Sequence, residues 1–301
     1  MLAVVGCDVP VALAPPGSVA PPPRPTAVQP APASAESQAV KMHFAKVQAD
    51  LLSAGLLRTD GGGADTPFTD RMLAENFIRI ALYDEYARTA AGPVERLSES
   101  RLRRWVAPVR VGLRFGASVP VQVKATDTAR VASYLARLSQ ITGHPIRLDD
   151  AAPNFWIYIV DEDERRALGP VISRALPSLS PGEVASVTGM TRSTYCLVYA
   201  LSEGNSGVYN RAFAVIRAEH PDLLRLSCIH EEIAQGLGLA NDSPRARPSI
   251  FNDDEEFALL TGQDELMLRI LYHPLLRPGM TETEARPIVQ SLTSRLVGGA
   301  S

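Results

Sequence analysis

The side chains whose spacing best suits a chemical site lie in one short segment of the chain. Glu231 and Gln235 stand one helical turn apart, and Asn241 follows beyond Gly238. If a helix ends in a turn at that glycine, the three oxygen-bearing side chains are expected to reach one point in space. Glu232, beside the first of them, stands where a general base would be needed. This segment is therefore the candidate site.

The same spacing occurs in the metzincin zinc-peptidase motif, H-E-x-x-H-x-x-G-x-x-H, whose imidazoles bind the metal. The motif's glutamate and glycine are present as Glu232 and Gly238. The three metal positions are degenerate and read Glu231, Gln235 and Asn241, so carboxylate and amide oxygens replace every imidazole. Amide oxygens bind zinc poorly and suit hard cations.

Three interpretations of this donor set stay open. In the first, the three side chains hydrogen-bond to one another and no metal is present. In the second, they hold a hard divalent cation weakly. In the third, they bind zinc together with an additional ligand, which is His230, Asp242 or another side chain. We expect no metal and no cofactor. Without zinc a bound water keeps its high pKa, so Glu232 is interpreted as a vestigial base that accepts hydrogen bonds. His230 is expected to point about 100° away from Glu231 and to serve in packing.

A second feature supports this register. Ser249-Ile250-Phe251 is similar to the metzincin Met-turn, with Phe251 in place of the methionine under the metal. A rival register starting at His230 would put Ala234 at the second ligand position, where it could bind nothing.

The chain resembles the domain-of-unknown-function 2927 family of proteobacterial lipoproteins over residues 41 to 285. The resemblance is carried by FTDRMLAENFIRIALYDEY (68–86), CIHEEIAQGLGLAND (228–242), SIFNDD (249–254) and DELMLRILYHPLLRPGM (264–280). It implies a zincin-like fold and does not imply proteolysis.

The N-terminal segment has the composition of a lipid anchor and a spacer. Val4-Val5-Gly6-Cys7 is similar to a bacterial lipobox, and residues 8–40 are rich in Pro and Ala. No positively charged stretch precedes it, so a start codon placed too late and a chance apolar N-terminus both stay open. We expect lipidation at Cys7 and, from Asp8, retention at the periplasmic face of the inner membrane in preference to the outer membrane.

Two further cysteines, Cys196 and Cys228, form an even pair. They could form a disulfide, remain as buried thiols, or supply a Cys228 thiolate to a metal. Cys196 lies on an expected strand and Cys228 at the start of the helix that packs on it, which favours the disulfide and fits an oxidising compartment.

The elements predict an α+β protein with a mixed sheet and a motif helix. Helices are expected at 41–57, 69–90, 126–142, 223–239 and 264–272, and strands at 109–115, 154–160, 195–201 and 208–217. The expected organisation is a signal remnant (1–7), a disordered linker (8–40), a helical region (41–100), a zincin-like domain (101–285) and a tail (286–301).

The functional expectation is an exported lipoprotein that binds a peptide, a protein or a cell-wall component without cleaving it. The alternative is a metal-dependent, peptidase-like hydrolase with atypical ligands. A net charge of −3 over 301 residues gives no electrostatic case for nucleic acid.

Overall fold

The computed structural model describes residues 32–89, 92–204 and 206–298, without the side chains of residues 85–97. Cys7 and residues 8–31 of the expected linker lie outside the described residues. The helices are α1 (Ala35–Ser53), α2 (Asp70–Ala81), α3 (Val121–Thr142), α4 (Glu162–Arg166), α5 (Gly169–Ala175), α6 (Pro181–Thr188), α7 (Asp222–Leu237), α8 (Gly262–Leu271) and α9 (Glu282–Val297). The strands are β1 (Tyr83–Thr89), β2 (Gly92–Glu99), β3 (Arg104–Trp105), β4 (Val109–Phe115), β5 (Ile146–Leu148), β6 (Phe155–Val160), β7 (Cys196–Ser202) and β8 (Val208–Arg217).

The central sheet is mostly parallel. Its strands follow the order β3-β8-β6-β4-β5, and each neighbouring pair in that order is parallel. β7 pairs antiparallel with β8, from Cys196 opposite Ile216 to Ser202 opposite Tyr209. Among the described strands β7 has β8 as its one neighbour, so its other edge is open.

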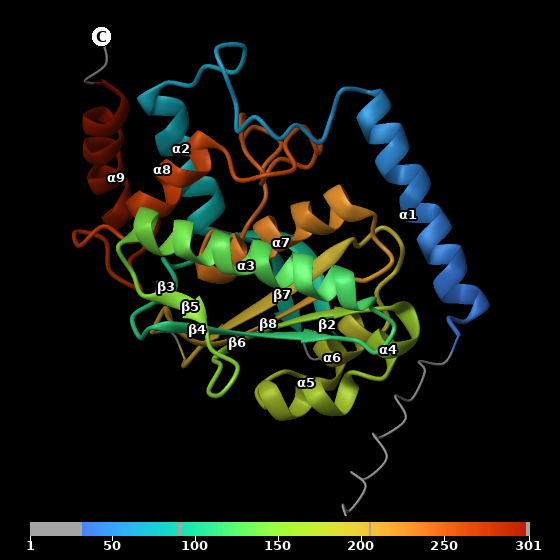
Figure 1. Cartoon of the computed structure of the whole chain (residues 1–301). Helices are drawn as coiled ribbons and strands as arrows, with labels where there is room; N and C mark the ends of the chain where they lie inside the picture. Colours follow the sequence, from blue (N-terminus) through green and yellow to red (C-terminus); the bar gives the residue numbers. More distant parts are fainter. Residues whose placement is uncertain (1–31, 90–91, 205, 299–301) are drawn as a thin grey trace, which may run out of the picture. The chain divides into compact units, whose positions relative to one another are not determined.

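Helices cover both faces of this sheet (Figure 1). Leu135 of α3 and Ile229 of α7 share one apolar cluster with Ile157 of β6. On the opposite face, Ile172 of α5 and Val187 of α6 belong to a second cluster. A strand buried on both faces is expected to read as a continuous apolar run, and β6 and the end of β8 do so.

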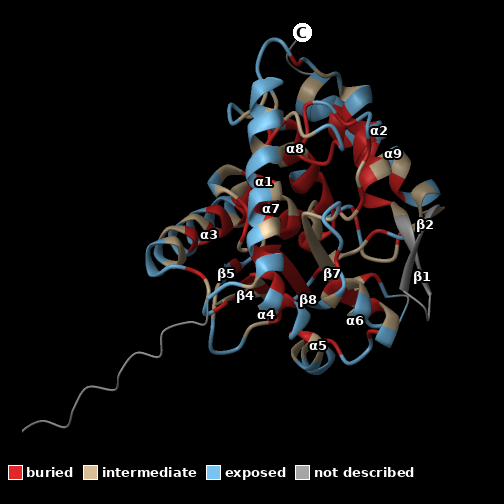
Figure 2. Cartoon of the chain, turned by 90° about the vertical axis from the view of Figure 1, so that its right-hand side faces the viewer, coloured by how far each residue is buried: buried red, intermediate tan, exposed pale blue. Residues whose placement is uncertain are grey.

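The remaining helices pack around this layered core. α2 contacts α8 and α9, and all three contribute to the larger apolar cluster. α1 lies outside and buries only Ser37, Val40 and Phe44, so most of its length is exposed (Figure 2). None of the described helices is both long enough and apolar enough to cross a bilayer.

The structure confirms a mixed fold of helices and sheet and corrects three boundaries. The helix expected to run to Ala90 ends at Ala81 and is followed by the antiparallel β1–β2 pair. The segment assigned to a linker becomes helical at Ala35, where Ser34 caps α1. The segment assigned to a tail holds α9, whose start carries a capping box formed by Thr281 and Glu284.

Candidate functional site

The motif helix α7 can pack closely on the sheet because it carries a glycine, Gly236, where it faces β6. A Cβ on Gly236 would stand 2.5 Å from the ring of Phe155 on β6. The Gly236 carbonyl accepts a 2.8 Å hydrogen bond from the indole N–H of Trp105. The C-terminal turn of α7 is thereby fixed against the sheet.

Gly238 ends α7 and turns the chain. It adopts φ 128°, and a Cβ there would overlap the backbone oxygen of Arg103. After this turn Asn241 is buried, and its side-chain amide donates to the Arg79 carbonyl oxygen at 3.0 Å. The next residue, Asp242, is the one that reaches the site. The structure therefore does not bring Asn241 together with the motif side chains on α7.

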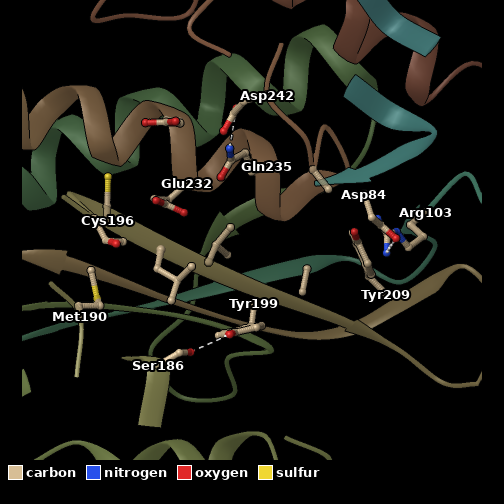
Figure 3. A pocket seen from close by; sticks show the side chains of 16 residues that line it. Asp84, Arg103, Ser186, Met190, Cys196, Tyr199, Tyr209, Glu232, Gln235 and Asp242 are labelled. Atoms are coloured by element: carbon tan, nitrogen blue, oxygen red, sulfur yellow. Dashed lines mark hydrogen bonds and ion pairs between the residues drawn. The ribbon is translucent and has the colours of Figure 1, made fainter. Parts of the chain in front are cut away.

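Two adjoining cavities of about 410 and 690 Å³ form a cleft beside α7. Glu231, Glu232 and Asp242 line both of them, so these carboxyl groups stand at the junction. Gln235 lines the smaller cavity, and its side-chain N–H donates to Asp242 at 3.1 Å (Figure 3). Three carboxyl groups and one amide thus make up the centre of the cleft.

Burial sets the ionisation of this centre. Burial first, and then the neighbouring Asp242 carboxylate, raises the pKa of both Glu231 and Glu232 well above the usual range. Glu232 is only 3% exposed, and its Oε2 has no hydrogen-bond partner among the described residues. A buried carboxyl oxygen without a donor is costly, so this group favours a ligand that supplies one.

The opposite wall of the cleft is the open edge of β7, and its backbone orientation follows from β8. The Ala212 N–H of β8 donates to Asn154, beside β6, at 2.9 Å. Backbone groups alternate along a strand, so Val215, three residues further on, faces the other way. There it pairs with Leu197 of β7, whose own N–H and C=O must point back toward β8.

Val198 and Ala200 consequently turn their backbone N–H and C=O groups away from β8. No described residue hydrogen-bonds to those groups on the open side. The residues from Cys196 to Ala200 all line the smaller cavity. The cleft therefore runs along an unpaired strand edge with the carboxyl centre above it.

Paired polar groups stand along the rest of the smaller cavity. Arg103 forms an ion pair with Asp84, and the Tyr199 hydroxyl lies 2.9 Å from the Ser186 hydroxyl (Figure 3). These residues were not predicted from the sequence, because they come from segments far apart that only the fold brings together. The strand predicted at 195–201, which the Cys196–Cys228 pair places beside the motif helix, was the one sequence signal that could have pointed to them.

The far end of the larger cavity is acidic. Asp253 and Glu255 line it, and burial raises the pKa of Glu255 to about 7. Ile250 of the Ser249-Ile250-Phe251 turn reaches this cavity, whereas Phe251 is fully buried in the core. The turn is anchored by the Ser249 hydroxyl, which donates to Asp264 at 2.6 Å.

His230 faces away from the cleft. Its ring stacks on Tyr134 with centroids 3.9 Å apart, and its Nδ1 accepts from the Leu260 N–H at 3.2 Å. Burial lowers its pKa to about 3, so the ring is neutral at physiological pH. This residue packs the back of α7 against α3.

Cys196 and Cys228 form the expected disulfide, with Cα atoms 5.9 Å apart. It joins β7 to α7, the two walls of the cleft. The spacing between the open strand edge and the carboxyl centre is therefore fixed by a covalent bond.

The fold and the site define a class: an α/β protein with a mostly parallel sheet, one antiparallel strand with an open edge, and an acidic cleft along that edge. The chain belongs to the family described as "Protein of unknown function (DUF2927)", whose sequence model matches residues 70–291. Comparisons with curated proteins and with solved structures gave no match.

Proposed function

We propose that this protein binds an extended peptide segment in the cleft along β7 and does not cleave it. The observation that carries the proposal is the row of outward backbone groups at Val198 and Ala200, inside a cavity that Glu232, whose Oε2 has no hydrogen-bond partner among the described residues, also lines. An extended peptide can add to such an edge as a further strand through main-chain hydrogen bonds.

The proposal includes a zincin-like fold with its metal chemistry lost. Zincin clefts hold peptides along a sheet edge beside the motif helix, and that mode of binding needs no metal. The polar side chains that α7 and the turn after it contribute to the lining of this cleft are Glu231, Glu232, Gln235 and Asp242, with no imidazole from α7 among them. That donor set suits zinc poorly. Among the described residues no group of three His, Cys, Asp or Glu could hold a metal ion.

The proposed setting is the periplasmic face of a bacterial membrane, with a lipid anchor at Cys7. Support comes from the lipobox-like sequence and from the disulfide, which suits an oxidising compartment. The ligand would be a peptide, an exposed segment of a protein or a peptide component of the cell wall.

The test is a panel of fluorescent eight-residue peptides in extended, β-prone sequences, assayed by polarisation against the full chain. Each peptide that binds is then resynthesised with a single backbone N-methyl group at every position in turn. Strand addition predicts that methylation weakens binding at alternate positions only, because only alternate N–H groups face β7. The proposal would be refuted if N-methylation left the peptide affinity unchanged at every position, or if no peptide bound.

A further inference from the structure

The junction of the two cavities holds a carboxyl group that lacks a partner. Glu232 Oε2 is buried and accepts no hydrogen bond from any described residue, although Glu231 and Asp242 stand beside it. Most buried carboxyl groups among the described residues accept hydrogen bonds: Asp264, for example, accepts from the Ser249 and Thr261 hydroxyls and from two backbone N–H groups. Glu219 Oε2 also lacks a partner, but Glu219 is outside the described lining of either cavity. Glu232 is therefore the carboxyl group without a donor that a ligand in the cleft can reach.

The charges lining the cleft have one predominant sign. Besides the three junction carboxyls, Asp253 and Glu255 line the larger cavity. The two arginines that line the cleft are already ion-paired, Arg103 with Asp84 and Arg192 with Glu36. Burial raises the pKa values of Glu231, Glu232 and Glu255, so these acidic groups hold protons more readily than exposed carboxyls do. A cation that enters the cleft favours their ionised forms, and the resulting attraction is weakly screened in partly buried surroundings.

The geometry distinguishes an organic cation from a metal ion. A metal needs several donor atoms converging at about 2.0–2.6 Å from one point. No such group of three exists among the described residues, and the Gln235 amide is already turned to donate to Asp242. An ammonium or guanidinium group instead takes hydrogen bonds of about 2.7–2.9 Å from carboxylates spread around a wider space.

We propose that the junction of Glu231, Glu232 and Asp242 is a specificity pocket for a positively charged side chain, lysine or arginine, on the bound peptide. This inference rests on the proposed function and names its ligand class. The backbone of the peptide lies along β7, and its cation donates to Glu232 Oε2. The strand edge supplies general affinity, and the carboxyl centre selects the residue that lies opposite it.

The experiment uses peptide pairs that differ by one charge. A single lysine is moved along a neutral, extended octapeptide, and each peptide is matched with one that carries uncharged norleucine at the same position. At one or two positions the lysine peptide is expected to bind the full chain about 10- to 100-fold more tightly than its partner. Glu232→Gln should reduce this ratio to below about 3-fold, with melting temperature as the check on folding.

Glu265→Gln is the matched control, because Glu265 is a carboxylate outside the described lining of either cavity, ion-paired with Arg137. It should leave the ratio unchanged. Equal binding of every lysine and norleucine peptide, with alternate N-methyl sensitivity retained, would overturn the charge pocket and leave strand addition standing. Stabilisation of the wild type by Zn²⁺ or Ca²⁺ that is lost in Glu232→Gln would also overturn it, in favour of a metal.

Butylammonium serves as a probe that is independent of the peptide. If no peptide binds but butylammonium binds the wild type and not Glu232→Gln, measured by calorimetry, the charge pocket stands and strand addition fails. If neither binds, both inferences are overturned.

Discussion

Proline at Ala200 should separate ligand binding from folding. The Ala200 N–H points to the open edge of β7, so its removal breaks no bond of the β7–β8 ladder. Proline is tolerated at edge strands in this orientation. A peptide that adds as a strand would lose one main-chain hydrogen bond there and would meet the pyrrolidine ring.

The expected magnitudes differ sharply between neighbouring positions. For Ala200→Pro the free energy of unfolding should fall by no more than about 1 kcal/mol, from backbone adjustment alone. Peptide affinity should fall about 10-fold or more, since one hydrogen bond contributes about 0.5–1.5 kcal/mol and the ring adds a clash. Leu197→Pro, on the same strand, removes a bond to β8 and should cost about 3 kcal/mol.

Urea unfolding followed by circular dichroism measures the stabilities, and polarisation of a bound peptide measures the affinity. If Ala200→Pro destabilises the fold as much as Leu197→Pro, the deduced backbone alternation is wrong. If Ala200→Pro keeps full affinity, the ligand does not pair with this edge.

Three other outcomes are expected. Gly238→Ala should destabilise the fold by about 3 kcal/mol or more in urea unfolding, because φ 128° and the overlap with a backbone oxygen both oppose a Cβ; Gly262→Ala, where a Cβ meets nothing, should cost less than about 1 kcal/mol. Cys196→Ser should lower the free energy of unfolding by about 3–4 kcal/mol relative to the oxidised protein. A melting temperature that is unchanged in this variant would contradict the structural role given to the disulfide. Burial raises the pKa of Glu255 to about 7, so the folded protein keeps this proton at pH values where the unfolded chain, with a pKa near 4.5, has lost it. The free energy of unfolding should therefore decline as pH rises from about 4.5 to 7. Glu255→Gln should reduce this pH dependence in melting curves, and an unchanged pH dependence would contradict the raised pKa of Glu255.

Elements with strong local patterns were predictable from the sequence. β8 spans the residues predicted for it, and α3 ends at Gly143 in the left-handed conformation that a terminal glycine allows. The β1–β2 pair was missed because the segment after Ala81 continues with residues of good helix propensity, and its strands form through pairing that local propensity does not encode. α9 was missed although Thr281 and Glu284 carry the capping-box signal.

The candidate site was half predictable. Spacing on a helix placed Glu231, Glu232 and Gln235 together, because the period of a helix is fixed. Beyond Gly238, sequence spacing does not predict which side chain lines the cleft. Asp242 lines it and Asn241 does not, because of the backbone conformation of the turn itself. The open edge of β7 depends on the order of strands in the sheet, which no local pattern contains.

Residue-resolved amide hydrogen exchange on β7 tests the central claim most directly. In the free protein the Val198 and Ala200 amides should exchange quickly, while the Leu197 and Tyr199 amides, which face β8, should be protected. Saturation with a bound peptide should protect Val198 and Ala200 and leave the other two little changed. Protection elsewhere on the protein, with Val198 and Ala200 still exchanging quickly, would contradict strand addition at this edge.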